Sequence, residues 1–165
     1  MWLDLPNLWI VILNVVGIPA IHLGISWLYT KMDLTRFDPE SALYRERTWE
    51  GGGEVYQRLF RIRSWKARLP DAAPWFDGFA KGNLRDKNPA YLRTFTAETC
   101  RSEAAHYAQI LGLLLSVIWN PWPIAAVVMM VYAVFSNLPC ILLQRFTRAR
   151  LRRFLAEIGA KGSGA

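Results

Sequence analysis

Apolar residues gather into three long runs along the chain, at about 8–29, 104–119 and 122–143, and no lysine or arginine lies within them. Each run approaches the roughly 20 residues that a helix needs to cross about 30 Å of hydrocarbon. We therefore expect an all-α integral membrane protein with three transmembrane helices in a single membrane domain, residues 1–165. The first run is longer than the apolar core of a cleaved signal peptide and has no positive flank before it, so we do not expect it to be removed.

The basic residues predict how these helices are oriented. All 20 lysines and arginines lie between Lys31 and Arg101 or from Arg145 onward, and the turn NPWP (Asn120–Pro123) contains none. Basic segments stay in the cytoplasm, so the N-terminus and the turn are expected outside, and the central region and the C-terminus inside. The chain is then a multi-pass protein of the bacterial cytoplasmic (inner) membrane. The two prolines of the turn force the second and third helices into an antiparallel hairpin.

The net charge of +7 bears on the partners that are expected. Because the basic side chains flank the predicted spans, they match the anionic headgroups of the cytoplasmic leaflet, so membrane lipids are expected as partners and nucleic acid is not. Cys100 and Cys140 both map to the reducing side of the membrane and lack a metal-type spacing. We expect both to be small buried hydrophobic residues without a disulfide.

Residues 31–103 are predicted to form a cytoplasmic interfacial region. Glu54–Pro70 combines five basic residues with apolar side chains at helical spacing. These apolar side chains are Val55, Leu59, Ile62 and Trp65. The pattern predicts a basic amphipathic helix in the headgroup plane, with or without a part in catalysis, that ends at Pro70. A loop rich in Pro, Gly and aromatic residues follows, and Asn88 and Pro89 then begin a helix that continues into the second run.

The stretch AETCRSEAAH (Ala97–His106) brings ionisable residues to the start of the second run. At 100° per residue, most of the polar side chains here share one broad arc of a helix. The arc holds Glu98, Arg101, Ser102, His106 and Gln109. Glu103 and His106, three residues apart, resemble half of a di-metal carboxylate site, but no second pair exists, so no metal is expected. The polar face continues past the predicted membrane boundary.

A second polar stripe lies at the end of the third run. Within NLPCILLQRFTRAR, four polar residues recur at i, i+3, i+7 and i+11 of a helix. They are Asn137, Cys140, Gln144 and Arg148. Folding the hairpin places this stripe at the depth of the first one, and His22 of the first run comes to a depth similar to that of His106, about 20 Å from the outer surface. We expect the stripes to face each other, because a charge turned toward lipid costs a few kcal/mol.

Intramembrane ionisable residues favour a functional site, although ion pairs of Glu98 with Arg101 or Arg145 could instead serve only to hold helices together. The sequence contains no Gly-x-Ser-x-Gly elbow, no Walker loop and no His-x4-Asp acyltransferase signature. A covalent serine mechanism therefore lacks support. A general base with charge stabilisers at a membrane boundary fits the movement of a group between a lipid and a hydroxyl.

The order of five motifs identifies a family that this chain resembles. The motifs are NVVGIPAIHLGISWL, WKARLPD, AETCRSEAAH, WNPW and NLPCILLQRFTRARL, from about Asn14 to Leu151. Together they are similar to the glycosyl-4,4'-diaponeurosporenoate acyltransferases of staphyloxanthin-type carotenoid synthesis. The resemblance implies transfer of a fatty acyl chain onto a sugar hydroxyl of a glycosylated carotenoid or related glycolipid, on the cytoplasmic side. It implies an acyl donor such as acyl-CoA as co-substrate and no cofactor.

Roles within this reaction are assigned from the residue chemistry. His106 is the expected general base, tuned by Glu103 or Glu98, and His22 is an alternative base or a substrate-positioning group. Arginine forks suit the phosphates or carbonyl of a donor, and further polar residues of the stripes complete the substrate-binding set. That set is Arg101, Asn137, Gln144, Arg145 and Arg148, with Lys66 and Arg68 as secondary anion contacts.

Two other functions remain open at this point. The chain could be a non-catalytic membrane subunit that scaffolds a pigment–protein or lipid-synthesis complex, with its polar stripes serving only to join helices. It could also be a transporter, although three spans would then have to oligomerise. A cavity that opens to the cytoplasmic leaflet favours the enzyme, whereas a fully packed polar face favours the scaffold.

Overall fold

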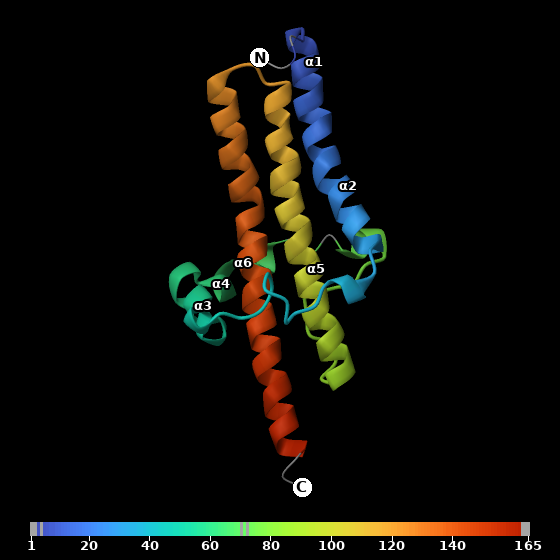
Figure 1. The fold of residues 1–165 in the computed structure, drawn as a ribbon, viewed down its shortest axis with the longest axis vertical. Helices are drawn as coiled ribbons and strands as arrows, with labels where there is room; N and C mark the ends of the chain where they lie inside the picture. Colours follow the sequence, from blue (N-terminus) through green and yellow to red (C-terminus); the bar gives the residue numbers. More distant parts are fainter. Residues whose placement is uncertain (1–2, 4, 70, 72, 163–165) are drawn as a thin grey trace.

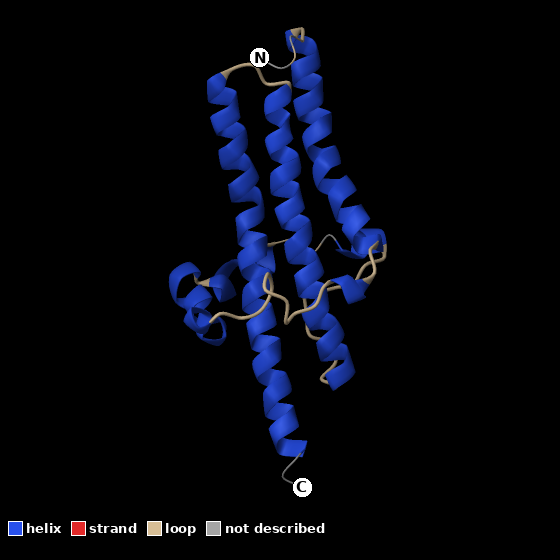
Figure 2. Cartoon of the chain, in the orientation of Figure 1, coloured by secondary structure: helices blue, strands red, loops and turns tan. Residues whose placement is uncertain are grey.

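The computed structural model describes residues 3, 5–69, 71 and 73–162, and every regular element within them is helical (Figure 2). The predicted all-α class is confirmed for this part of the chain. Three long rods run side by side, and α5 lies between the other two (Figure 1). They are α1 (Asn7–Ile12) with a π-helical segment (Leu13–Gly17) and α2 (Ile18–Lys31); α5 (Pro89–Leu114) with a 3-10 turn (Leu115–Ile118); and α6 (Pro123–Gly162).

Local sequence sets the limits of α5. The Asn88 side chain accepts a 2.8 Å hydrogen bond from the backbone of Ala90, and Pro89 is the first helical residue, as predicted. At the other end, the side-chain amides of Asn14 and Asn120 exchange hydrogen bonds of 2.9 and 3.1 Å, and Trp119 donates to Asn14 at 2.9 Å. These bonds tie the turn to the first rod. The antiparallel hairpin of α5 and α6 is confirmed.

Two helices are long and apolar enough to cross a membrane, by length and composition: Asn7–Lys31 and Pro123–Ala160. Both leave large apolar side chains exposed, as lipid contact would require. These include Leu8, Trp9, Val15, Val16, Ile124, Val131 and Phe135. Because α5 carries charged residues through its first half, it does not stand out by the same criterion. The third span and the orientation stay predictions.

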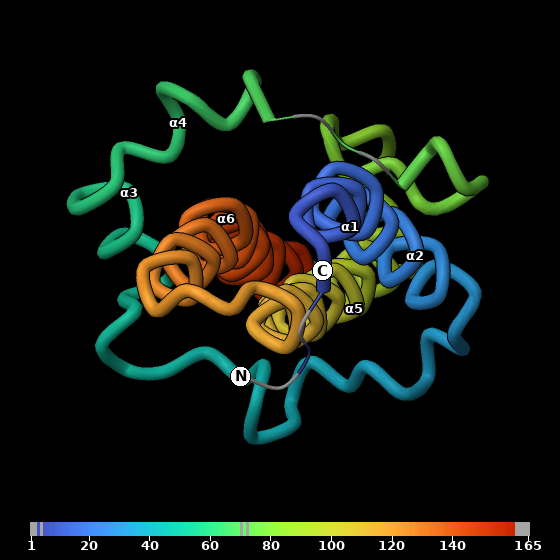
Figure 3. Tube along the Cα trace, turned by 90° about the horizontal axis from the view of Figure 1, so that it is seen from above, coloured from blue at the N-terminus to red at the C-terminus, as the bar shows by residue number. Residues whose placement is uncertain are grey.

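The described part of residues 32–88, called the girdle below, encircles the three rods (Figure 3). It contains 3-10 turns at Leu34–Arg36, Thr48–Gly53, Lys66–Arg68 and Ala73–Phe76, and two short helices, α3 (Glu54–Phe60) and α4 (Ile62–Trp65). Gly53 has a φ of 88°, and a Cβ there would lie 3.3–3.4 Å from Ala149 and Phe146 of α6. Glycine therefore lets the girdle turn directly against α6.

The single amphipathic helix predicted from Glu54 is wrong. The backbone of Arg61 adopts the left-handed conformation (φ 50°, ψ 42°) and divides the segment into α3 and α4. The break is stabilised by Trp65, whose indole donates a 2.7 Å hydrogen bond to the carbonyl of Phe60. It turns Ile62 into the core against α6, while Leu59 on the same predicted stripe stays exposed. Pro70, the predicted end of the helix, lies outside the described residues.

Candidate active site

A cavity of about 1350 Å³ lies between the rods and the girdle, lined by residues of α2, α5, α6 and girdle residues 51–87. Polar side chains of the predicted stripes reach its wall. From α5 these are Glu98, Arg101, Ser102, His106 and Gln109, and from α6 they are Cys140 and Gln144. The two stripes face a common cavity, so the polar faces of α5 and α6 are not fully packed. This geometry suits the binding of a small molecule.

His106 is held by two side-chain amides. Its Nδ1 lies 2.9 Å from Oδ1 of Asn137 and 3.1 Å from Oε1 of Gln109. Each amide nitrogen has acceptors of its own: Gln109 donates to the carbonyl of His22 and to Ser26, and Asn137 donates to a backbone carbonyl of α6. Both amides therefore turn their oxygens toward the imidazole. Nδ1 must carry the hydrogen, which leaves the lone pair on Nε2.

The other ring nitrogen, Nε2 of His106, forms no hydrogen bond with any residue that the structure describes, and His106 lines the cavity. It can therefore accept a proton from a molecule bound there. His22 differs, because both of its ring nitrogens are occupied. Its Nδ1 lies 3.3 Å from Oε1 of Gln109 and its Nε2 lies 3.3 Å from the hydroxyl of Tyr132. His22 also does not line the cavity.

Two charged side chains of α5, Glu98 and Arg101, form an ion pair on the same cavity wall as His106. The Glu98 carboxylate accepts two hydrogen bonds, of 2.7 and 2.8 Å, from Nη2 of Arg101. Nη1 of Arg101 donates to the carbonyls of Thr30 and Met32 at the end of α2. Burial raises the pKa of Glu98, although the neighbouring cations oppose this shift. Arg101 is thereby fixed in one orientation at the cavity.

Lys81 is a site residue that sequence reasoning missed. It belongs to the girdle, its side chain is only 11% exposed, and its ammonium lies 3.9 Å from the carboxylate of Asp71. Burial lowers the pKa of Lys81, and Asp71 opposes this shift. No periodicity marks the segment around Lys81, because it lies in an irregular loop, so only the folded chain shows that it reaches the cavity.

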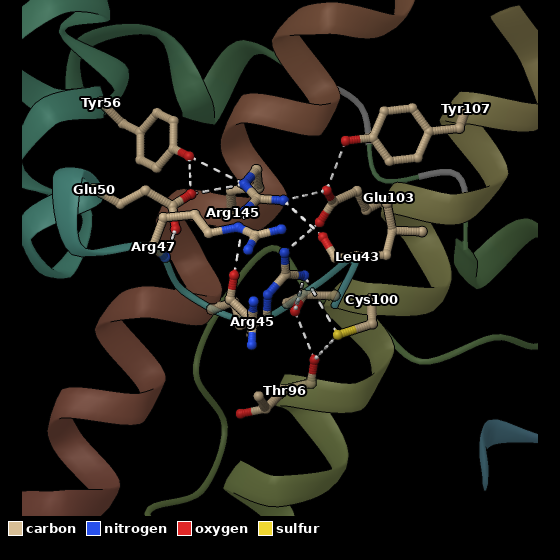
Figure 4. Close-up of polar contacts among 12 residues, drawn as sticks. Leu43, Arg45, Arg47, Glu50, Tyr56, Thr96, Cys100, Glu103, Tyr107 and Arg145 are labelled. Atoms are coloured by element: carbon tan, nitrogen blue, oxygen red, sulfur yellow. Dashed lines mark hydrogen bonds and ion pairs between the residues drawn. The ribbon is translucent and has the colours of Figure 1, made fainter. Parts of the chain in front are cut away.

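Glu103 lies away from the cavity, in a buried network of charges (Figure 4). Its carboxylate, fully buried, forms ion pairs with Arg145 at 2.8 Å and with Arg148, and it accepts a 2.9 Å hydrogen bond from Tyr107. Arg145 also pairs with Glu50 of the girdle at 2.8 Å. Arg145 and Arg148 therefore both bind Glu103, and the structure shows no contact between Glu103 and His106.

Glu50 carries this network from α6 to the girdle. Burial would raise the pKa of Glu50, but hydrogen bonds from Arg145, Tyr56 and the backbone of Arg47 outweigh it and hold that pKa below its usual value. Burial raises the pKa of Tyr56, which donates to the same carboxylate. The network thus joins α5, α6 and the girdle through charge-assisted bonds.

Of the remaining predicted site residues, two line the cavity and two do not. Gln144 and Lys66 line the cavity, whereas Arg68 is exposed and does not. Asn137 acts on the cavity indirectly, through His106. Within the described residues, no group of three or more His, Cys, Asp or Glu side chains is placed to hold a metal ion.

Comparison with known proteins adds the chemistry. A family model described as glycosyl-4,4'-diaponeurosporenoate acyltransferase matches residues 40–157. Proteins of that name from Staphylococcus aureus strains Newman, USA300 and NCTC 8325 / PS 47 are 26%, 25% and 25% identical over 144 residues, 86% of this chain and 86% of each relative. No solved structure matches the chain. The match spans α5, most of α6 and the cavity-lining part of the girdle, so it covers the cavity lining except for the residues that α2 contributes. This chain belongs to the glycosyl-4,4'-diaponeurosporenoate acyltransferase family and is an acyltransferase.

Proposed function

We propose that this protein transfers a fatty acyl chain from a donor such as acyl-CoA onto a sugar hydroxyl of a glycosylated carotenoid or related glycolipid. The names of its relatives support this acceptor class. The observation that carries the proposal is the environment of His106, which lines the cavity, has two amide oxygens at Nδ1, and has no hydrogen bond at Nε2 with any residue that the structure describes. A neutral imidazole in that state is a general base for a hydroxyl.

The reaction then proceeds in the cavity as follows. Nε2 of His106 takes the proton of the sugar hydroxyl as its oxygen attacks the donor carbonyl. An ester C–O bond forms, the bond to the donor's leaving group breaks, and the proton passes to that leaving group. The oxygens of Asn137 and Gln109 stabilise the imidazolium, and the cations Arg101 and Lys81 stabilise the negative charge on the carbonyl oxygen.

The proposal includes three spans with the N-terminus outside and the cavity at the cytoplasmic leaflet. Two helices of sufficient length and apolarity support it, as does the girdle, which gathers its basic residues at one level of the rods (Figure 1). A lipid acceptor could enter the cavity sideways, and a polar donor could enter from the cytoplasm. Membrane lipids, the glycolipid acceptor and the acyl donor are the partners implied.

Arg145 and Arg148 are assigned a different role from the donor binding expected of them in sequence. Because both pair with the buried Glu103 and neither lines the cavity, we assign them to the attachment of the girdle. Lys81 and Arg101 take over the stabilisation of charge at the reacting carbonyl.

Replacement of the base tests the proposed function. His106→Ala should abolish acyl transfer while the protein remains inserted and folded, because the other histidine of the chain, His22, does not line the cavity. The measurement is mass spectrometry of membrane lipids from cells that express either the wild type or the variant as their only copy. His22→Ala is the matched control and should keep most of the activity. Full acyl transfer by His106→Ala would overturn the assignment of the base.

A further inference from the structure

The lining of the cavity carries an excess of positive charge. Eight basic and four acidic residues line the cavity within the described part of the chain. The basic residues are Arg58, Arg63, Lys66, Lys81, Lys87, Arg101, Arg150 and Arg153; the acidic residues are Glu54, Asp71, Glu98 and Glu157. The proposed reaction uses His106 as the base and only Arg101 and Lys81 to stabilise the carbonyl oxygen. Most of the cations that line the cavity therefore have no part in that reaction.

Three of the cations form ion pairs with neighbouring carboxylates. The pairs are Lys81 with Asp71 at 3.9 Å, Arg101 with Glu98 at 2.7 Å, and Arg153 with Glu54 at 3.1 Å. The other five cations form no ion pair within the described residues. Of the four acidic lining residues, three belong to the pairs above, and Glu157 is the fourth. These five are Arg58, Arg63, Lys66, Lys87 and Arg150.

The unpaired cations come from separate segments that the fold brings to one cavity. Arg58 belongs to α3, Arg63 to α4, and Arg150 to α6. Lys66 comes from the 3-10 turn Lys66–Arg68 and Lys87 from an irregular part of the girdle. Figure 3 shows the α3–α4 segment of the girdle on the outside of the rods, next to α6. Basic residues elsewhere, such as Arg36, do not line the cavity. Attraction to an anionic leaflet does not by itself require basic residues from separate segments to line one cavity.

We propose that this cluster of five cations binds the phosphate groups of the acyl donor, a ligand with two or more phosphates such as a coenzyme A thioester. This inference rests on the proposed acyl transfer. Cations that line one cavity without carboxylate partners repel one another, and a polyanion relieves that repulsion. Arginine and lysine bind phosphate through charge-assisted hydrogen bonds. Because His106 lines the same cavity, phosphates held by these cations leave the acyl end of the donor free to reach it.

Binding of coenzyme A itself is the test. The full-length protein, purified in a neutral detergent, is titrated with coenzyme A by calorimetry. The double variant Arg63→Gln/Lys66→Gln should bind at least about tenfold more weakly, since a charge-assisted hydrogen bond contributes roughly that factor. The matched control Arg36→Gln removes an exposed cation outside the cavity and should bind like the wild type. Wild-type-like binding by the double variant would overturn the proposal.

A lipid headgroup is the other source of phosphate, so a second arm measures partition into vesicles with and without phosphatidylglycerol. Loss of coenzyme A binding with unchanged vesicle partition supports the donor site. A wild type that does not bind coenzyme A, or a double variant that loses only its preference for phosphatidylglycerol, contradicts it. His106→Ala separates this inference from the proposed function, because it should bind coenzyme A normally without transferring an acyl chain.

Discussion

The buried network around Glu103 offers the most quantitative prediction. The side chain of Glu103 is fully buried, and its two ion-pair partners Arg148 and Arg145 are only 3% and 14% exposed. In Glu103→Gln, Arg145 keeps its pair with Glu50, but Arg148 keeps only Thr99, Cys100 and the ring of Tyr44. A buried guanidinium is then left without a counter-charge. Breaking a buried pair in this way costs about 3–5 kcal/mol.

The assay is equilibrium unfolding in mixed micelles of a mild detergent and dodecyl sulfate, followed by circular dichroism. Glu54→Gln is the control, because it breaks an ion pair whose members are 78% and 48% exposed, and such pairs are worth about 0–1 kcal/mol. Adding Arg148→Met to Glu103→Gln removes the orphaned charge and should restore part of the lost stability. If Glu103→Gln proved no more destabilising than Glu54→Gln, or the double variant were the less stable, the buried-charge reasoning would be refuted.

Two further predictions concern His106 and the response to acid. Asn137→Leu removes one of the two oxygens that fix the imidazole and should lower the rate of acyl transfer about 10–100-fold, measured in a detergent-solubilised assay, with coenzyme A binding unchanged; a normal rate would show that Asn137 does not position the base. The pKa of Glu50 is held below its usual value, so its contribution to stability is present above the unfolded pKa and is lost as the pH falls through the folded pKa. Unfolding measured from pH 6 down to pH 3 should show this loss in the wild type, and Glu50→Gln, already less stable, should show a shallower dependence; parallel curves would contradict the role of Glu50.

Much of the fold follows from local pattern. The apolar runs predict the three rods, because only continuous helices satisfy their backbone in an apolar medium. Asn88 and Pro89 begin α5 as predicted, and the NPWP turn produces the hairpin. Helical periodicity also predicts that the polar stripes on α5 and α6 share one depth, and the structure brings Asn137 against His106.

Other features depend on contacts between distant residues. Glu103 and His106 are neighbours on one helix, yet Glu103 pairs with Arg145 and Arg148 while His106 faces the cavity. The orientation of α6 relative to α5 decides which side chains of α5 meet the arginines of α6 and which face the cavity. Helical spacing within one segment does not specify that orientation. The left-handed conformation of Arg61 is likewise stabilised by packing of Ile62 against α6.

The sequence by itself determined the three long helices, their polar stripes and the chemistry available to them, since these depend on residue type and on spacing within one helix. Only the tertiary structure decided which of those groups enclose a cavity and which hold the girdle in place. Lys81 makes the difference plain, because it comes from an irregular loop that the girdle carries around the rods to the cavity wall. The position of Lys81 depends on how the girdle closes around the rods, which involves residues far apart in the sequence. No local pattern encodes that closure.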